Sequence, residues 1–217
     1  MNLAVLAVIQ ARVGSTRLPG KVLMDICGKT MLERVIERVR QARWVGPLVI
    51  AAPSGDLEIL KLVGKLGIKS YAGSELDVLD RFYRCTEGAF TIIRITADCP
   101  LMDPAVIDAA VQYYHVGEFD IVTNRPSYPD GQDCEVFSRA VLERVWTQAI
   151  EPYDREHVTS YIYEHPENFN IGRMRHDVDL SYLKWSVDTL EELEFVRKVY
   201  AELGEHFGLA DLLSLYS

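Results

Sequence analysis

Cysteine is scarce in this sequence of 217 residues, and its spacing excludes two common kinds of site. The four cysteines include no C-x-x-C pair and no spacing to histidine that a zinc site requires. They are Cys27, Cys85, Cys99 and Cys134. A disulfide framework is equally unexpected at so low a content. We therefore expect reduced thiols that serve mainly in packing.

Long hydrophobic runs and an excess of basic charge are missing as well. The first apolar run, Leu3–Ile9, is too short to span a membrane, and no basic segment precedes it as in a secretory signal. Lysine and arginine number 23 against 32 aspartate and glutamate residues, which gives a net charge of −9. This balance argues against nucleic acid or an anionic membrane as partner. We predict a cytoplasmic protein in which any anionic ligand meets a local cationic patch.

Several catalytic motifs are also absent. No G-x-x-x-x-G-K-[ST] loop occurs, because Lys21 is followed by Val22, and no G-x-G-x-x-G loop occurs either. These two absences disfavour kinase-type and NAD-type sites. The lack of a G-x-S-x-G elbow likewise disfavours acyl transfer.

What the sequence does contain is a regular alternation of apolar strand-like runs with segments of helical period. Strands are predicted at Leu3–Ile9, Leu48–Ala52, Lys69–Tyr71, Thr91–Thr96 and Asp120–Thr123, with a strand-like segment at Phe169–Met174. Helices are predicted at Thr30–Ala42, Asp56–Leu66, Leu76–Glu87, Pro104–His115, Arg139–Ala149, Arg155–Glu164 and Leu190–Leu203. This order predicts an α/β fold with a mostly parallel sheet and helices on both faces. We expect one domain over residues 1–217, with a small insertion around 124–175 that begins at a cluster of turn-forming residues.

The loop after the first strand, "VIQARVGSTRLPGK" (Val8–Lys21), is poor in apolar residues. It combines three basic residues, two hydroxyls and two glycines, which are Arg12, Arg17, Lys21, Ser15, Thr16, Gly14 and Gly20. In an open α/β sheet this loop lies at the carboxyl edge, where ligands bind, and glycine lets the backbone approach them closely. We favour a polyphosphate site here over a plain solvated connection.

This segment, extended to "VIQARVGSTRLPGKVL", resembles the N-terminal signature of the cytidylyltransferases that activate sugar acids, and most of all their spore-coat polysaccharide biosynthesis branch. The resemblance continues in order through nearly the whole chain, in "GSELDVLDRF" (73–82), "RITADCPLMDP" (94–104), "YPDGQDCEVFS" (128–138), "REHVTSYI" (155–162) and "KWSVDTLEELEFVR" (184–197). It implies a three-layer Rossmann-like nucleotidyltransferase fold, that of nucleotide-diphospho-sugar transferases. It also implies a homodimer in which the insertion reaches the neighbouring sugar site.

The resemblance further implies roles for the first loop. Arg12 and Lys21 would hold the phosphates of CTP with help from Arg17, while Ala11, Gly14 and Ser15 would contact phosphate and base through main-chain groups. The single glycine after "QAR", where uridylyl- and guanylyl-transferring relatives have "GG", favours CTP by analogy.

Two aspartates are the candidate ligands of Mg²⁺, which prefers oxygen donors and usually takes only one or two protein carboxylates. Asp98 follows the apolar strand "TIIRIT" and should emerge at the carboxyl edge of the sheet; the alternative is a turn aspartate before Pro100. Asp188 precedes Thr189, which has the capping-box spacing to Glu192, so on residues alone it is better explained as a charge at a helix start. Only the resemblance, to the family's "DT" motif, makes Asp188 the second metal ligand. Asp103, before Pro104, is better explained as a helix cap.

A sugar acid needs donors for its carboxylate and partners for its hydroxyls. The polar residues in the matching motifs are Asn124, Gln132, Asp133, Glu135, Arg155 and Lys184. Arg155 and Lys184 are slightly favoured, since carboxylates pair best with basic side chains. Each residue also has a structural alternative, as a turn residue or a surface charge. His157 is a possible general base, although such a histidine more often packs or caps.

The sequence thus predicts a Mg²⁺-dependent cytidylyltransferase that makes a CMP-activated sugar acid and pyrophosphate from CTP, for surface polysaccharide biosynthesis. Two alternatives stay open. One is a glycosyltransferase with the same fold that uses a nucleotide-sugar donor. The other is a non-catalytic nucleotide-binding subunit, which would bind CTP without turnover.

Overall fold

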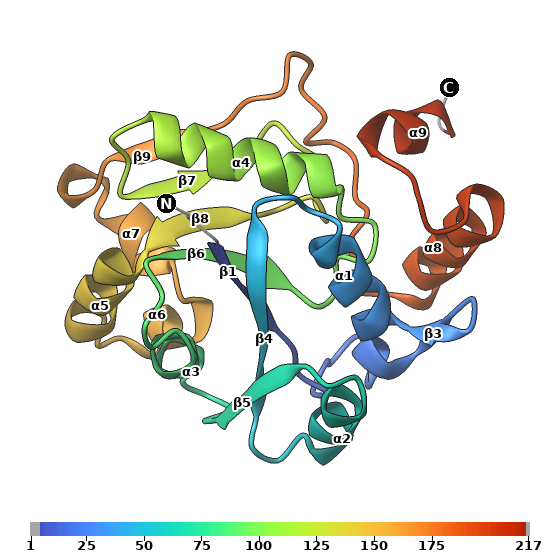
Figure 1. The fold of residues 1–217 in the computed structure, drawn as a ribbon, viewed down its shortest axis with the longest axis horizontal. Helices are drawn as coiled ribbons and strands as arrows, with labels where there is room; N and C mark the ends of the chain where they lie inside the picture. Colours follow the sequence, from blue (N-terminus) through green and yellow to red (C-terminus); the bar gives the residue numbers. More distant parts are fainter. Residues whose placement is uncertain (1–4, 216–217) are drawn as a thin grey trace.

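A seven-stranded sheet runs through the centre of the structure, a computed structural model that describes residues 5–215. The strands lie in the order β5-β4-β1-β6-β8-β7-β9, and every pairing is parallel except those that β8 makes with β6 and β7 (Figure 1). Their bounds are β1 Val5–Gln10, β4 Val45–Pro53, β5 Lys69–Gly73, β6 Thr91–Thr96, β7 Ile121–Thr123, β8 Glu135–Ser138 and β9 Ile171–Arg173. A separate two-stranded hairpin joins β2 (Asp25–Ile26) to β3 (Lys29–Thr30).

Helices cover both faces of the sheet. They are α1 Met31–Arg40, α2 Leu57–Lys65, α3 Val78–Cys85, α4 Pro104–Val116, α5 Arg139–Gln148, α6 Pro152–His157, α7 Ser160–Glu164, α8 Leu190–Leu203 and α9 Leu209–Ser214, with 3₁₀ turns at Lys21–Leu23 and Pro166–Asn168. Figure 1 shows α1 and α2 on one side of β1 and β4 and α3 on the other. Within residues 5–215, no helix has the length and apolar character needed to cross a lipid bilayer.

The two hydrophobic layers follow from the alternation of side chains along each buried strand. Ala7 and Ile9 of β1 pack into the layer formed with α1, α2 and α4, while Val8 between them packs into the layer formed with α3 and α5. A third cluster joins α8 and α9 to the β2–β3 hairpin around Trp185, which is 1% exposed. This third cluster anchors the start of α8 beside the carboxyl edge of the sheet.

Local capping signals explain where three helices begin. Thr30 and Glu33 form a reciprocal capping box on α1, and Thr189 and Glu192 form one on α8. The Asp103 carboxylate accepts a hydrogen bond from the Ala105 backbone N–H at 2.8 Å at the start of α4. The predicted caps at Asp103 and Thr189 are therefore confirmed.

The predicted α/β class with a mostly parallel sheet is confirmed, and the strand Thr91–Thr96 and the helix Leu190–Leu203 have the predicted bounds. Residues 3–4 of the first predicted strand lie outside the described residues. The single helix predicted over 155–164 is wrong, because the chain forms α6 and α7 with a break at Val158, whose φ is 59°. β8, the β2–β3 hairpin and α9 are short and were not predicted from the sequence.

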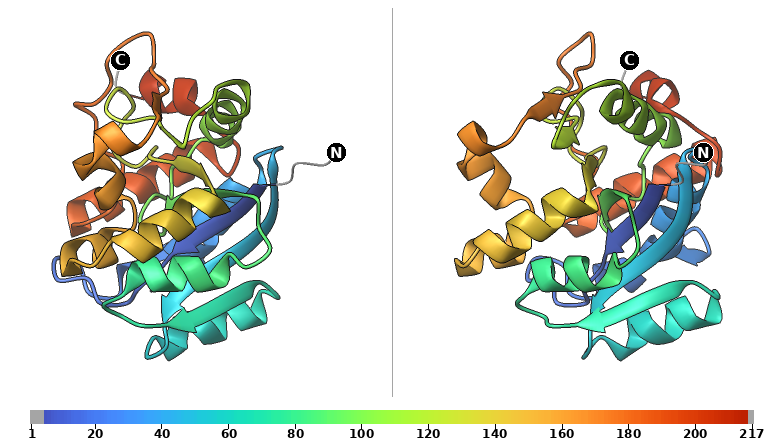
Figure 2. Two further views of the ribbon diagram at one scale, coloured as in Figure 1. Left: turned by 90° about the vertical axis from the view of Figure 1, so that its left-hand side faces the viewer. Right: turned by 60° about the vertical axis from the view of Figure 1, so that its left-hand side comes forward.

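The segment between β9 and α8 leads the chain from the β9 edge of the sheet to α8, which packs beside the β2–β3 hairpin, as its orange trace shows in Figure 1. Figure 2 shows the same segment from two further sides. On this path it runs beside the turn at 129–133: the N–H groups of Trp185 and Ser186 donate to the Asp130 carbonyl at 2.6 and 3.2 Å. Gly131 makes this approach possible. Its φ is 100°, and a Cβ atom there would lie 2.5 Å from the Ser186 nitrogen.

Gly131→Ala should lower the free energy of unfolding by about 2 kcal/mol or more, since it combines a left-handed backbone with an overlap against other backbone atoms. Gly88→Ala is the matched control, because Gly88 has a φ of 78° but no atom within 4 Å of its hypothetical Cβ. The control should cost only about 1 kcal/mol. Urea denaturation of both variants measures the difference, and equal losses would show that the close approach at Gly131 does not limit stability.

Candidate active site

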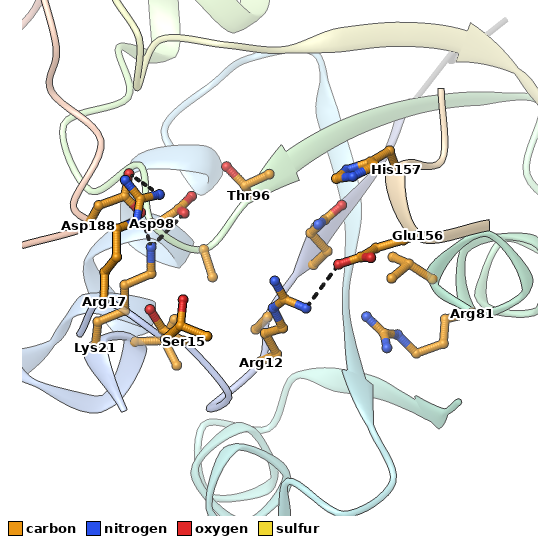
Figure 3. Close-up of a pocket in the computed structure, with 16 residues that line it drawn as sticks. Arg12, Ser15, Arg17, Lys21, Arg81, Thr96, Asp98, Glu156, His157 and Asp188 are labelled. Carbon is orange, nitrogen blue, oxygen red and sulfur yellow. Dashed lines mark hydrogen bonds and ion pairs between the residues drawn. The ribbon is translucent and has the colours of Figure 1, made fainter. Parts of the chain in front are cut away.

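A buried lysine joins three distant segments at the carboxyl edge of the sheet. The Lys21 ammonium donates to Asp98 Oδ2 at 2.9 Å, to Asp188 Oδ1 at 2.9 Å and to the Val187 carbonyl at 2.6 Å (Figure 3). Lys21 ends the loop after β1, Asp98 lies in the turn after β6, and Asp188 precedes α8. The predicted convergence of these three residues is therefore observed in the structure.

The charges of this cluster are mutually stabilised. Burial alone would lower the pKa of Lys21, but Asp98 and Asp188 outweigh it and raise that pKa above its usual value. Burial alone would raise the pKa of Asp98, but the Lys21 ammonium and the Thr96 hydroxyl lower it below its usual value. The pKa of Asp188 is likewise lowered, because Lys21 and Lys184 together outweigh its partial burial. All three groups are consequently charged at neutral pH.

Asp188 is held by two further cations. Arg17 Nη2 lies 2.9 Å and Lys184 Nζ lies 3.0 Å from Asp188 Oδ2. Lys184 also pairs with Glu192 at 2.5 Å, and the Glu192 carboxylate accepts from the backbone N–H of Asp188 at 2.5 Å. The capping box of α8 thus fixes the main chain at Asp188, which confirms the structural explanation given above for this stretch.

A cavity of about 230 Å³ opens over the loop after β1. Of the residues predicted to bind nucleotide, those that line it are Ala11, Arg12, Ser15, Arg17, Lys21, Asp98 and Asp188. Gly14 lies in the same loop without lining the cavity. Arg12 pairs with Glu156 at 3.4 Å, and both side chains are about half exposed, so this pair is weak and Arg12 is available to a ligand.

A second cavity of about 640 Å³ adjoins the first, and Arg17, Thr96, Asp98, His157 and Asp188 line both. Its far wall contains charge pairs between side chains. Arg94 pairs with Glu135 at 2.8 Å and Arg125 pairs with Asp133 at 2.6 Å. The Tyr163 hydroxyl also donates to Glu135 at 2.6 Å. Asp133 and Glu135, predicted to bind the second substrate, therefore line this larger cavity, and Asp98 and Asp188 stand where the two cavities meet.

Three other residues predicted to bind substrate are placed elsewhere. Within the part of the chain that the structure describes, the Lys184 side chain contacts Asp188 and Glu192. Asn124 is fully buried, where its amide donates to the Gln132 carbonyl and accepts from the Cys134 N–H. Gln132 is also buried and bonds the backbone of Leu101 and Asp103. The Arg155 guanidinium forms a bidentate pair with Asp77, with contacts of 2.6 and 3.0 Å. None of these three side chains lines either cavity, and each holds other parts of the chain together, Arg155 also through the Trp146 carbonyl at 2.9 Å.

Several residues that line the cavities were not predicted as site residues from the sequence. They are Arg81, Arg94, Thr96, Arg125, Thr159, Tyr163 and Arg173. Arg81 and Arg94 lie within quoted motifs, but each is in a helix or strand where an arginine normally faces solvent. Their burial depends on how α3 and β6 pack.

Two carboxylates are available to hold a cation at the junction. The oxygens of Asp98 and Asp188 both lie 2.9 Å from Lys21 Nζ, so they already share one cation, the Lys21 ammonium. The described residues contain no cluster of three or more His, Cys, Asp or Glu side chains that would bind a metal by themselves. The pair therefore suits a hard divalent cation that completes its shell with water and phosphate oxygens, as Mg²⁺ does.

An α/β sheet with a cationic loop and two convergent carboxylates between two cavities is the architecture of a nucleotidyltransferase. A family model described as cytidylyltransferase matches residues 6–207, and the chain belongs to this family.

Individual relatives agree with this assignment. The chain is 40% identical over 219 residues to a 3-deoxy-manno-octulosonate cytidylyltransferase of Solibacter usitatus, covering 91% of this chain and 81% of the relative. It is 32% identical to the spore coat polysaccharide biosynthesis protein SpsF of Bacillus subtilis, covering 93% and 88%. A solved cytidylyltransferase structure from Leptospira borgpetersenii superposes with a TM-score of 0.92 at 27% identity, covering 98% of this chain and 93% of the other.

Lys21→Met should lower the free energy of unfolding by roughly 2 kcal/mol at pH 7, because it leaves two carboxylates without their shared cation. The lowered pKa values of Asp98 and Asp188 stabilise the fold above the ordinary aspartate value of 3.8, and this contribution is lost as the pH falls through the folded-state values. The deficit of the variant should therefore shrink at pH 3.

Urea denaturation at pH 7 and pH 3 measures this deficit, with Lys29→Met as the control. Lys29 pairs with Glu37 and Glu205 at the surface, so its loss should cost less than about 1 kcal/mol. A deficit at Lys21 that stays constant or grows at pH 3 would contradict the assigned ion pairs.

Proposed function

We propose that the protein transfers a cytidylyl group from CTP to a hydroxyl group of a sugar acid and releases pyrophosphate, with Mg²⁺ as cofactor. The observation that carries this proposal is the Lys21–Asp98–Asp188 cluster at the junction of the two cavities. A transfer reaction needs the donor and the acceptor on either side of the charge that develops between them.

The smaller cavity takes CTP. Lys21, Arg17 and Arg12 supply positive charge for the triphosphate, and Ser15 offers a hydroxyl at the same loop. Ala11 lines the same cavity and would contact the ligand through its main chain, whereas Gly14, which does not line the cavity, would act by letting the loop backbone bend. The net negative charge of the chain makes this local concentration of basic groups the natural place for a tetra-anionic nucleotide.

The larger cavity takes the sugar acid. Its wall offers hydroxyl and carboxylate partners for sugar hydroxyls at Thr159, Tyr163 and Glu135, and guanidinium groups at Arg125 and Arg173 for a carboxylate. The relatives named for 3-deoxy-manno-octulosonate and for spore-coat polysaccharide support an acidic sugar destined for a surface polymer. Asp133 lines this cavity and holds Arg125, whereas Lys184 lies outside it and would act by holding Asp188.

Asp98 and Asp188 would hold Mg²⁺, which neutralises charge on the phosphoryl oxygens when it is bound. Before substrates bind, Lys21 keeps these two carboxylates paired and charged. When the acceptor oxygen attacks the α-phosphorus, the bond to the β-phosphate oxygen breaks, and Arg12 and Lys21 meet the charge on the departing pyrophosphate. His157 lines both cavities, and its imidazole would accept the proton of the acceptor hydroxyl.

The organisation as one domain over residues 1–217, the insertion around 124–175, the homodimer and the cytoplasmic location are retained as parts of this proposal. The two cavities lie within one chain, so dimerisation would add to the acceptor cavity rather than create it.

Purified protein should release pyrophosphate from CTP when Mg²⁺ and a suitable octulosonic or nonulosonic acid are present. Asp98→Asn should slow this release by at least about 10²-fold, because it removes a carboxylate from the reacting centre. Asp179→Asn, at an exposed aspartate that accepts from the Ser181 N–H, is the control and should have wild-type activity.

The same assay separates the alternatives. Transfer from a supplied nucleotide-sugar, without pyrophosphate release from CTP, would replace the proposal with a glycosyltransferase. CTP binding that survives Asp98→Asn, together with no turnover on any acceptor, would indicate a non-catalytic nucleotide-binding subunit.

A further inference from the structure

The chain makes a strained turn between α6 and α7, and Val158 is its central residue. Val158 has a φ of 59° and a ψ of −55°, and the Thr159 N–H donates to the His157 carbonyl at 2.6 Å. These values describe a γ-turn with positive φ, which is the rare and strained form. The branched side chain makes the turn more costly, because a positive φ brings Cβ against the backbone. Glycine is the residue that adopts such a conformation without this cost.

Contacts on several sides compensate for the strained backbone. The Val158 side chain is 1% exposed and belongs to the hydrophobic layer formed with α3 and α5. The Ser160 hydroxyl donates to the Asp154 carboxylate at 2.5 Å and so ties α7 to α6 across the turn. The Thr159 hydroxyl donates to Glu135 on β8 at 2.9 Å. Strained backbone that neighbouring contacts maintain in this way is concentrated at functional sites.

The turn places the side chains on either side of it in one cavity. His157 and Thr159 both line the larger cavity, whereas Val158 between them lines neither cavity. In an unbroken helix, residues two positions apart lie about 200° apart around the axis, so only one of this pair would face the cavity. Figure 3 shows the His157 ring extending from the end of α6 into the smaller cavity, which His157 also lines. The positive φ at Val158 therefore brings both side chains to the place where the two substrates would meet.

We propose that Val158 is a positioning residue, whose γ-turn aims the His157 imidazole at the acceptor hydroxyl while it holds Thr159 against Glu135. This inference rests on the proposed function. The Val158 side chain packs in the hydrophobic layer, so it acts through its neighbours and not on a substrate. If its backbone relaxed to a helical φ, His157 would turn away from the larger cavity or Thr159 would leave Glu135. A displacement of about 1 Å at a reacting group is enough to cost about 10²-fold in rate.

Alanine and glycine at position 158 separate the effect of the backbone from that of packing. Val158→Ala keeps a Cβ, and hence the cost of a positive φ, but loses most of the packing that imposes the turn. Val158→Gly loses still more packing but adopts the turn without steric cost. We therefore expect kcat for pyrophosphate release to fall about 10-fold or more in Val158→Ala and less than about 3-fold in Val158→Gly. KM for CTP should stay within about 2-fold in both variants.

Val145 provides the matched control. It is 1% exposed in the same hydrophobic layer, lies within helix α5 and lines neither cavity. Alanine is preferred to glycine at a helical position, so Val145→Gly should be less stable than Val145→Ala. The order should reverse at position 158, where Val158→Ala should be the less stable variant. Urea midpoints of the four variants measure both orders, and neither Val145 variant should alter kcat.

A double variant tests whether Val158 acts through His157. His157→Ala should lower kcat, and adding Val158→Ala to it should lower kcat by no more than about 2-fold further, because the positioned group is already missing. A full additional loss would show that Val158→Ala damages the site in general, and it would overturn the positioning role.

The variants at position 158 can overturn the proposal in two further ways. One is that Val158→Ala equals or exceeds Val158→Gly in stability, which is the order expected at Val145. The other is that both variants keep the kcat of an active wild-type protein. Failure of the proposed function is a different result, in which the wild-type protein releases no pyrophosphate from CTP, and the order of stabilities still tests the turn.

A measurement on the wild-type protein decides if neither variant folds. The NMR coupling constant between the amide and α protons of Val158 should be larger than the constants of the helical residues around it, because a φ of 59° aligns these protons differently from a helical φ. A helical coupling constant at Val158 would overturn the γ-turn and the positioning role with it.

Discussion

The ammonium of Lys21 between Asp98 and Asp188 is the interaction on which the candidate active site depends. In the sequence, Lys21 is separated from Asp98 by 77 positions and from Asp188 by 167 positions. The ammonium therefore holds the loop after β1, the turn after β6 and the start of α8 against one another. None of the three charges would be stable alone in so buried a place. Together they keep two carboxylates ionised beside a cationic loop, which is the electrostatic setting that phosphoryl chemistry requires.

The two cavities differ in how their charges are balanced. On the acceptor side, Arg94 and Arg125 are neutralised by Glu135 and Asp133, so this wall is organised before any ligand arrives. In the smaller cavity, Arg12 has a weak exposed partner, and Arg81 forms no ion pair within residues 5–215 and bonds only backbone carbonyls there. The unbalanced charge lies where an anionic, acceptor-rich nucleotide would restore the balance.

Much of the fold was predictable, because the hydrophobic period of a long segment indicates whether it forms a helix or a strand. The strand at 91–96 has isoleucines on both faces, which is typical of a central strand, and the capping residues of α4 and α8 fix where those helices begin. The short elements were predicted poorly, because their limits depend on tertiary packing and not on a long periodic pattern. In α6 and α7 the helical pattern continues through Val158, and only the packing around this buried residue imposes its positive φ and the break.

The part of the candidate site that lies at the carboxyl edge of the sheet was predictable, because the order of the strands determines which loops reach that edge. Asp98 follows the end of a buried strand, and a basic, glycine-containing loop follows another, so both had to reach the same edge of a parallel sheet. Asn124, Gln132 and Arg155 had equally suitable chemistry, but sequence does not tell whether a polar side chain points into a cavity or towards a backbone segment. In the structure, all three make structural hydrogen bonds.

The sequence by itself determined the α/β class, the edge of the sheet where ligands bind and the family of the protein, since these follow from periodicity and from motifs contained in single segments. Tertiary structure alone decided which charges meet. Asp188 reaches Asp98 because the chain crosses from β9 to α8 and the Val187 N–H bonds the Asp98 carbonyl at 2.9 Å. Arg81 is buried because α3 packs against the sheet at β4 and β5. Pairing and burial are relations between distant segments, and only the folded chain brings those segments within the few ångströms over which charges and hydrogen bonds act.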